Sequence, residues 1–149
     1  MSDLQNKILN VLKDGKFHSG ESLGELLGVS RTAVWKQLQK LEEIGLEVES
    51  VKGTGYRVVN GIDLLVRDDI IAHLRSDNGS PPRSIELFQS LDSTNKYLRE
   101  QADKTDCSGS VVFAERQTSG RGRRGKTWVS PFAANIYMSI LWDFEQGAQ

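Results

Sequence analysis

The feature that most limits the possible folds is one change of hydrophobic period near Gly45. Before this residue the apolar side chains recur every three or four positions, which predicts amphipathic helices. After it they alternate along the chain, which predicts strands. The helices are expected at residues 4–12, 20–27 and 31–44, and the strands at 46–51 and 56–59.

The second and third predicted helices are joined by a short turn that contains Gly28. A glycine at this position can adopt the left-handed conformation that commonly ends a helix. The third helix then begins at Arg31, with Ser30 as its N-cap. The side of the second helix expected to be buried carries Leu23, Leu26 and Leu27. A short helix, a tight turn and a longer helix are typical of a helix-turn-helix.

The predicted strands after the third helix form a hairpin around the turn Lys52-Gly53-Thr54-Gly55. Three helices followed by a glycine-rich hairpin predict a winged helix-turn-helix, whose third helix enters the major groove of DNA. Exposed polar and cationic residues there can contact phosphates and base edges. The expected DNA-binding residues are Ser30, Arg31, Thr32, Trp35, Lys36, Gln39, Lys52 and Arg57. The alternative is a solvated helix face in a domain that only packs against its neighbour.

Composition places the chain among ordinary globular proteins. Its net charge is −1 and hydrophobic residues make up 38% of it, so any attraction to DNA has to come from local clusters of cations. Cys107 is the one cysteine, which fits a reducing cytoplasm because no internal disulfide can form. The sequence has neither a signal peptide nor an apolar run long enough to span a membrane. We therefore expect a cytoplasmic protein without a membrane partner.

A second region follows the predicted linker 60–63. Its helices are expected at 64–74 and 96–102, and its strands at 84–88, 110–115 and 135–142. Ser93, Thr94 and Asn95 precede the second of these helices. Such residues are ordinary helix caps, but they can also hold a polar ligand at the positive end of the helix.

The segment 116–126 carries five cations and no carboxylate. Its stretch Gly120-Arg121-Gly122-Arg123-Arg124-Gly125 formally matches a dinucleotide-binding pattern, but that pattern requires a helix directly after the glycines. Strand-forming residues and Pro131 follow instead. The sequence therefore predicts a basic loop between strands, able to surround a phosphate with amides and guanidinium groups. A nucleic-acid-binding segment or a flexible surface loop is the alternative.

The last predicted strand places four apolar residues on one face, and no helix follows to cover that face. These residues are Ile136, Met138, Ile140 and Trp142. The sheet is therefore expected to be unfinished within this sequence.

Taken together, the motifs resemble a known family. After the winged helix come Asp92-Ser93-Thr94-Asn95, then Ala114-Glu115, Gln117, the glycine–arginine stretch 120–125, Trp128 and Ser130-Pro131. This combination resembles the bifunctional biotin–protein ligases that also act as biotin operon repressors. The resemblance implies an α+β fold, with a winged helix-turn-helix at 1–62. The first part of a mixed α/β, class II synthetase-like ligase domain is implied at 63–149.

The resemblance also implies roles for individual residues. Those matching the biotin and biotinyl-5′-AMP site are Ser93, Thr94, Asn95, Gln117, Arg121, Gly122 and Arg123. Three cations are expected to act in catalysis, namely Arg121, Arg123 and Arg124. Biotin, ATP and Mg²⁺ carried by ATP are implied, and no protein metal site. The implied partners are operator DNA, the biotin carboxyl carrier protein as acceptor, and a second copy of the full-length protein on DNA.

Members of this family continue beyond the position that corresponds to residue 149, through a catalytic lysine segment and a small barrel. The resemblance thus implies that the chain is truncated and inactive alone as a biotin–[acetyl-CoA-carboxylase] ligase. One alternative remains from another functional class. It is a winged-helix transcription regulator whose second region senses a ligand or dimerises, without ligase activity. Binding of biotin together with ATP would distinguish the two.

Overall fold

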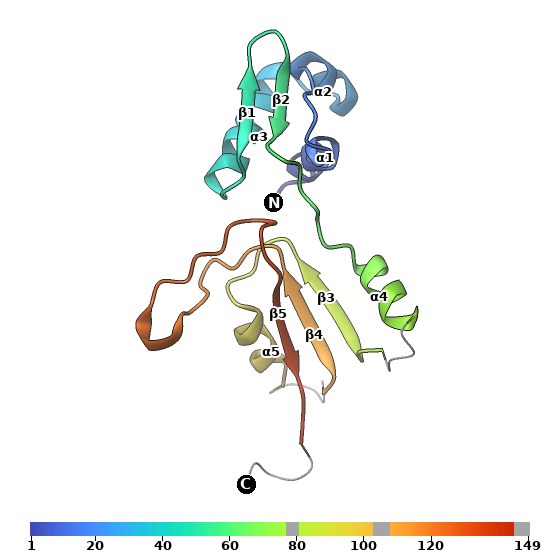
Figure 1. Cartoon of the computed structure of the whole chain (residues 1–149), viewed down its shortest axis with the longest axis vertical. Coiled ribbons are helices and arrows are strands. Elements are labelled where there is room, and N and C mark those ends of the chain that lie inside the picture. The colour runs from blue at the N-terminus through green and yellow to red at the C-terminus, as the bar shows by residue number, and fades with distance from the viewer. Residues whose placement is uncertain (77–80, 103–107, 145–149) are drawn as a thin grey trace. The chain divides into compact units, whose positions relative to one another are not determined.

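The computed structural model describes residues 1–76, 81–102 and 108–144. The chain forms two compact units, Met1–Asp63 with Pro131–Ala134, and Leu64–Ser130 with Asn135–Gln149. Each unit has its own buried core, and the ribbon in Figure 1 shows both helices and strands in the chain. The α+β class predicted from the sequence is confirmed. Cys107, which supported the expectation of a reducing compartment, lies outside the described residues.

The first unit contains three helices and a hairpin, in the predicted order. They are α1 (Asp3–Leu12), α2 (Gly20–Leu27), α3 (Arg31–Glu43), β1 (Val48–Val51) and β2 (Gly55–Val58). Each helix begins after a serine whose hydroxyl accepts a backbone N–H three residues later, namely Ser2, Ser19 and Ser30. These N-caps satisfy N–H groups that have no partner inside the helix, which explains where each helix starts.

Leucine, isoleucine and valine side chains from α1 and α3 form the core of this unit. Those with at most 2% exposure include Ile8, Leu9, Leu12, Val34, Leu38 and Leu41. Leu23 of α2 joins them, but Leu26 is 67% exposed, so the expectation that Leu26 is buried is wrong. The buried side of α2 runs through Gly20, Leu23 and Gly24. Leu26 lies about 100° around the helix from this side.

The hairpin is antiparallel, with Val48 opposite Val58 and Val51 opposite Gly55. The strand β2 also pairs with the segment before α2, because His18 and Tyr56 exchange backbone hydrogen bonds of 2.9 Å in both directions. Gly55 is required here, since its φ is +131° and a Cβ atom would overlap the carbonyl of His18. The hairpin is thereby fixed to the helices.

The second unit contains a three-stranded sheet in the order β3-β4-β5. Its elements are α4 (Arg67–Ser76), β3 (Ser84–Phe88), α5 (Thr94–Ala102), β4 (Ser110–Ala114), the 3₁₀ turn η1 (Arg123–Gly125) and β5 (Tyr137–Leu141). The central strand β4 pairs parallel with β3 and antiparallel with β5. All five β4 residues are buried, as expected for a strand flanked on both edges and covered on both faces.

The helix predicted at 64–74 begins later, at Arg67. Before it, the backbone N–H of Leu65 donates a 2.6 Å hydrogen bond to the carboxylate of Glu115, which is only 3% exposed. This long-range bond fixes the backbone of Leu65 just before the helix begins. The hydrophobic period alone could not reveal it, because Glu115 lies 50 residues away in the sequence.

The two faces of the sheet are covered differently. Paired residues on neighbouring strands share a face, so Ile85, Val111 and Ile140 face the same side, as do Leu87, Phe113 and Met138. Ile70 and Ile71 of α4 pack on the β3 and β4 part of this side. The helix α5 packs against β4 and β5, and its Tyr97 hydroxyl donates to Glu86 (2.8 Å) on the opposite side.

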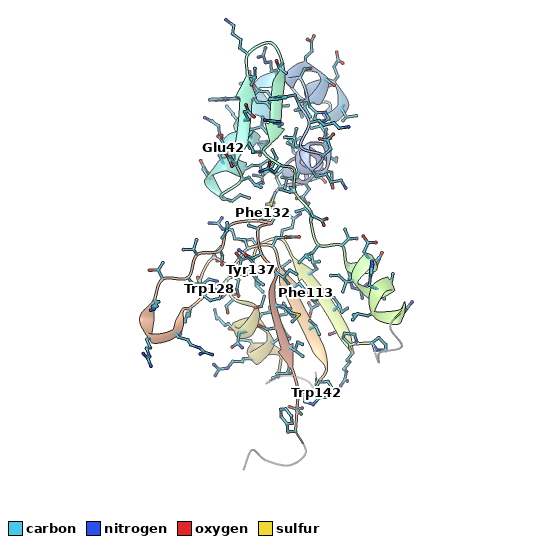
Figure 2. All side chains as sticks on the ribbon, viewed as in Figure 1. Glu42, Phe113, Trp128, Phe132, Tyr137 and Trp142 are labelled. Carbon is cyan, nitrogen blue, oxygen red and sulfur yellow. The ribbon has the colours of Figure 1, made fainter. Side chains whose placement is uncertain are left out.

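The α4 side of the sheet is left bare over β5. Ile136, Met138, Ile140 and Trp142 are 69%, 49%, 55% and 63% exposed. Figure 2 shows Trp142 past the end of β5, away from Phe113 in the sheet. The predicted exposed apolar face is therefore present in the part of the chain that the structure describes.

Candidate functional site

The second unit brings the start of α5 beside the chain that leaves β4. The parallel pairing of β3 and β4 continues beyond both strands, because Leu91 and Gln117 form an isolated parallel bridge. The N–H of Thr118 donates to the carbonyl of Leu91, and that of Ser119 to Asp92, both at 2.9 Å. This backbone pairing places residues 92–95 next to residues 117–121.

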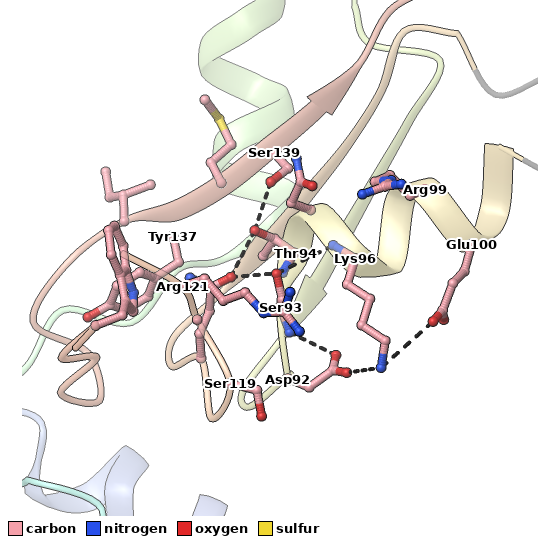
Figure 3. Close-up of a pocket in the computed structure, with 16 residues that line it drawn as sticks. Asp92, Ser93, Thr94, Lys96, Arg99, Glu100, Ser119, Arg121, Tyr137 and Ser139 are labelled. Carbon is pink, nitrogen blue, oxygen red and sulfur yellow. Dashed lines mark hydrogen bonds and ion pairs between the residues drawn. The ribbon is translucent and has the colours of Figure 1, made fainter. Parts of the chain in front are cut away.

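A chain of hydrogen bonds connects the start of α5, the segment after β4, and β5. The backbone N–H of Thr94 donates to Oε1 of Gln117 at 2.8 Å, and the Thr94 hydroxyl donates to the same atom at 3.1 Å. Oγ of Ser139 on β5 lies 2.8 Å from the Thr94 hydroxyl. Thr94 is 3% exposed, so these bonds are shielded from water. Figure 3 shows Thr94 and Ser139 linked in this way.

Some of the charged side chains at the outer rim form ion pairs with one another. Nζ of Lys96 lies 2.7 Å from the Asp92 carboxylate and 3.7 Å from that of Glu100. Lys96, followed by the N–H of Ser93, lowers the pKa of Asp92 below its ordinary value, so Asp92 is ionised at neutral pH. Arg99 and Arg121 form no such pair within the described ranges, and they supply the positive charge available to an anion.

These side chains surround a cavity of about 910 Å³ within the second unit (Figure 3). The lining contains both polar and apolar residues. The polar lining is Asp92, Ser93, Thr94, Asn95, Lys96, Arg99, Glu100, Gln117, Ser119, Arg121 and Ser139. The rest of the lining is Gly120, Trp128, Ile136, Tyr137 and Met138. A cavity of this size and mixed character suits a ligand with a polar head and an apolar body.

Gly120 allows the indole of Trp128 to reach this lining. A Cβ atom at residue 120 would overlap the ring carbons and nitrogen of Trp128. The ring therefore lies directly on the backbone of the loop, and any larger residue would displace it. This contact gives a physical reason for a glycine at the first position of the glycine–arginine stretch.

The remaining basic residues lie outside the cavity lining. The turn η1 contains Arg124 in the left-handed region (φ 58°, ψ 36°), which is unusual for a residue with a side chain. Arg123 and Arg124 are exposed. The expectation of an irregular loop is confirmed, because residues 126–136 contain neither helix nor strand and β5 follows.

The structure thus brings together five of the predicted ligand residues and leaves others aside. Ser93, Thr94, Asn95, Gln117 and Arg121 line one cavity, whereas Gly122, Arg123 and Arg124 do not. Sequence reasoning missed Ser139, Trp128 and Tyr137 as lining residues. A serine in the middle of an otherwise hydrophobic strand was the available signal for Ser139.

The predicted DNA-binding residues lie on the surface of the first unit. Ser30, Arg31, Thr32, Lys36, Gln39 and Lys52 are exposed, and Trp35 is 46% exposed. Ser30 already uses its hydroxyl to cap α3, through a 3.2 Å bond from the N–H of Ala33. The Arg57 guanidinium forms an ion pair with Glu49 (2.6 Å) and lies 4.6 Å above the ring centre of Phe17.

A hollow of about 460 Å³ lies between the start of α2, the start of α3 and the hairpin turn. Arg31, Lys52, Ser19 and Gly20 are among its lining residues. A Cβ atom on Gly20 would lie 3.1 Å from Cγ of Arg31, so the absence of a side chain at Gly20 makes room for this arginine. Arg31 of α3 and Lys52 of the hairpin turn therefore lie at the same surface hollow.

No group of three or more His, Cys, Asp or Glu residues that could hold a metal ion occurs in the described part of the chain. None of the described helices has both the length and the apolar character that crossing a membrane requires.

Two family models match parts of the chain. Residues 4–57 match the family model of an HTH domain. Residues 87–149 match that of the biotin/lipoate A/B protein ligase family. The resemblance inferred from the sequence motifs is confirmed.

Curated relatives combine both regions in one protein. The chain is 44% identical over 140 residues to the bifunctional ligase/repressor BirA of Salmonella typhimurium, an alignment that covers 94% of this chain and 42% of that protein. It is 44% identical over 141 residues to the Escherichia coli protein of the same name, covering 95% and 42%. For the Bacillus subtilis protein the identity is 34% over 126 residues, covering 85% and 38%. The chain therefore spans about two fifths of the length of these relatives.

Proposed function

Because the chain joins a helix-turn-helix domain to a region of the biotin/lipoate protein ligase family, we propose that it acts in a biotin–[acetyl-CoA-carboxylase] ligase that also represses the biotin operon. The observation that carries the ligase part is the cavity at the start of α5, where five of the seven residues matching the biotin site of the family gather. The family match over residues 87–149 favours this function over a sensor domain without ligase activity.

Biotin fits the chemistry of this cavity. Its ureido and carboxylate groups need hydrogen-bond partners, which Ser93 and Gln117 offer, while the hydroxyl of Thr94 is bonded to Gln117 and Ser139. Its ring and aliphatic chain need an apolar surface, which the aromatic rings of Trp128 and Tyr137 offer. Polar groups that fix orientation beside an apolar wall are typical of small-molecule sites.

The proposed reaction brings two anions together. The carboxylate of biotin attacks the α-phosphate of ATP, which forms biotinyl-5′-AMP and releases pyrophosphate. A lysine amine of the acceptor protein then attacks the acyl carbon, and AMP leaves. Cations at the cavity lower the repulsion between the two anions in the first step. Arg121 lines the cavity, and we propose that Arg123 and Arg124 approach the adenylate when the loop closes over it.

Mg²⁺ is implied by the use of ATP. Mg²⁺ prefers oxygen ligands and is commonly bound through substrate phosphates with one or two carboxylates. The rim carboxylates of Asp92 and Glu100 already pair with Lys96. We therefore assign the ion to the phosphates of ATP.

Titration of the chain with biotinyl-5′-AMP and with biotin tests the ligase site. We expect Arg121→Ala to weaken binding of the adenylate by about 10- to 100-fold, because a charge-assisted hydrogen bond to the phosphate contributes about 1.5–3 kcal/mol. Binding of biotin should change much less, since biotin lacks this phosphate. The matched control is Arg75→Ala, which removes an exposed cation of α4 outside the cavity. Equal loss for both ligands would contradict the proposed role of Arg121.

Repression requires that the first unit binds operator DNA, and we propose α3 as its recognition helix. Exposed Arg31, Thr32, Lys36 and Gln39 follow its N-terminus, the region that reads the major groove in such domains. Lys52 on the wing and Ser30 supply phosphate contacts in this proposal. A phosphate near Arg57 would have to share its guanidinium with Glu49.

We expect Arg31→Ala and Lys36→Ala each to weaken binding of a biotin-operon operator. A lost phosphate contact lowers the slope of log affinity against log salt by about 1, whereas a lost base contact costs about 1–3 kcal/mol at one base pair. Gel-shift titrations at several salt concentrations measure both effects. Lys7→Ala is the control, because Lys7 lies on α1 and pairs with Asp3 at 2.8 Å. Wild-type affinity and salt slope in both α3 variants would refute the recognition helix.

The full protein in this proposal biotinylates the biotin carboxyl carrier protein and binds DNA as a homodimer in the cytoplasm. The names of the curated relatives as ligase and repressor support the two activities. Co-purification of the full-length protein with its carrier protein and light scattering on operator DNA test these partners.

A further inference from the structure

The orientation of the Gln117 side-chain amide is fixed by its neighbours. A backbone N–H group can only donate, so the Gln117 atom 2.8 Å from the N–H of Thr94 has to be oxygen and not nitrogen. The hydroxyl of Thr94 donates to the same oxygen at 3.1 Å. Both acceptor positions of Oε1 are thereby filled.

Ser139 sets the direction of the second of these bonds. A threonine hydroxyl has one hydrogen, and that of Thr94 points to Gln117. Oγ of Ser139, at 2.8 Å, therefore donates its hydrogen to the Thr94 oxygen. The serine reaches Thr94 because it pairs with Val112 in the sheet, on the side where α5 packs. The hydrogen bonds thus point in one direction: Ser139 donates to Thr94, and Thr94 donates to Gln117.

The free end of the amide is then its NH₂ group. Gln117 lines the cavity, and its Nε2 atom has no hydrogen-bond partner within residues 1–76, 81–102 and 108–144. An amide turned the other way would present an acceptor to the ligand. The arrangement present here offers two N–H donors.

We propose that Ser139 is a positioning residue that, through Thr94, holds the Gln117 amide with its NH₂ group toward the cavity, so that this position of the site selects a hydrogen-bond acceptor on the ligand. With biotin as the ligand, which rests on the proposed function, the acceptor is an oxygen of the ureido or the carboxylate group. A ligand with a donor at the same place meets two N–H groups and is rejected. Ser139 itself lines the cavity but acts on the ligand through Thr94 and Gln117.

The first experiment needs no ligand and tests the relay alone. Hydrogen exchange of the Thr94 amide is measured by NMR in the wild-type chain and in Ser139→Ala, Ser139→Thr and Gln117→Leu. Thr94 is the first residue of α5, so its N–H depends on Gln117 for a partner. We expect about 3- to 10-fold faster exchange in Ser139→Ala, faster exchange still in Gln117→Leu, and recovery in Ser139→Thr. An unchanged rate in Ser139→Ala would overturn the relay.

The second experiment measures selectivity. Biotin, 2-iminobiotin, in which an imino group replaces the ureido oxygen, and biotinol, which lacks the carboxylate, are titrated into the same variants. We expect one analogue to bind the wild type about 3- to 10-fold more weakly than biotin, and this ratio to fall toward 1 in Ser139→Ala and to return in Ser139→Thr. The analogue that loses affinity identifies the oxygen that Gln117 binds.

The outcomes of the two experiments separate the two proposals. A loss of affinity for all three ligands with an unchanged ratio would assign Ser139 a purely structural role and overturn the selectivity. Wild-type chain that shows the expected Thr94 exchange but binds no biotin would leave the relay standing and contradict biotin as the ligand of this cavity. Circular dichroism of each variant verifies that it is folded.

Discussion

Replacement of Val112 by aspartate is expected to unfold the second unit and to leave the first unit folded. Val112 is fully buried in the middle of β4, the central strand of the sheet. A carboxylate there has no partner, and an uncompensated buried charge costs about 3–5 kcal/mol or more, which is a large part of the stability of a small domain. The core of the first unit contains no residue of β4, so α1, α2 and α3 should keep their packing.

Hydrogen exchange resolved along the chain measures this result. In Val112→Asp, amides of β3, β4 and β5 should lose protection while those of α1 and α3 keep it. The matched control is Ile140→Asp, the same kind of change on the neighbouring strand, at a residue that is 55% exposed. It should leave the sheet protected. Simultaneous loss of protection in both units of Val112→Asp would show that their cores do not fold independently.

The first unit was predictable from sequence because its structure depends on local signals. Ser19 and Ser30 cap helices, and Gly28 ends α2 with φ at +67°, as their positions in the sequence indicate. Leu26 is the exception. The buried side of α2 contains Gly20 and Gly24, where the third helix and its preceding turn approach closely. A pattern of leucines cannot reveal a face that is defined by small residues.

The proposed ligand site was only partly predictable because hydrogen bonds between distant segments build it. Ser93, Thr94 and Gln117 were identified through motifs, and the structure adds how they meet, through the parallel pairing of Leu91 with Gln117. Ser139 lies 45 residues after Thr94, and its role depends on the register of β5 against β4. Strand register of this kind follows from three-dimensional packing, which is not encoded in one short motif.

Arg123 and Arg124 show that a motif does not predict the position of residues in a charged loop. The sequence predicts cations for an anionic ligand, and the structure has both of them exposed on the turn η1, outside the cavity lining. A charge-rich loop has few apolar contacts to fix one conformation, so the position that it takes around a ligand depends on that ligand. The motif therefore predicts an anionic partner for these arginines, which stays a prediction, but it does not predict where they lie.

The last prediction concerns the whole proposed reaction, from formation of the adenylate to transfer of biotin. We expect the 149 residues, assayed by themselves, to transfer biotin to an acceptor protein at least about 10²-fold more slowly than a full-length relative. Trp128 lines the cavity and is 47% exposed, so water reaches its apolar lining. Exclusion of water strengthens the electrostatic interactions that stabilise a transition state and protects a reactive adenylate from hydrolysis.

A second cause of the slower transfer is that few cations at the cavity are free to stabilise the reacting phosphate. Arg99 and Arg121 are the cavity cations without an ion pair in the described ranges, and Lys96 is held by Asp92 and Glu100. The relatives are more than twice as long, and a group supplied by their additional residues can stabilise the reacting phosphate. Loss of one such group costs about 10²–10³-fold in rate.

Transfer of labelled biotin to a carrier domain, with ATP and Mg²⁺, measures this prediction against a full-length relative. Operator binding by the same preparation of the 149-residue chain is the control for folding of the first unit, and protection of β4 amides is the control for the second. With both controls satisfied, slow transfer would locate part of the catalytic machinery in the additional residues of the relatives. Transfer at a comparable rate would contradict the prediction, because the exposed lining and the two free arginines would then suffice for the chemistry.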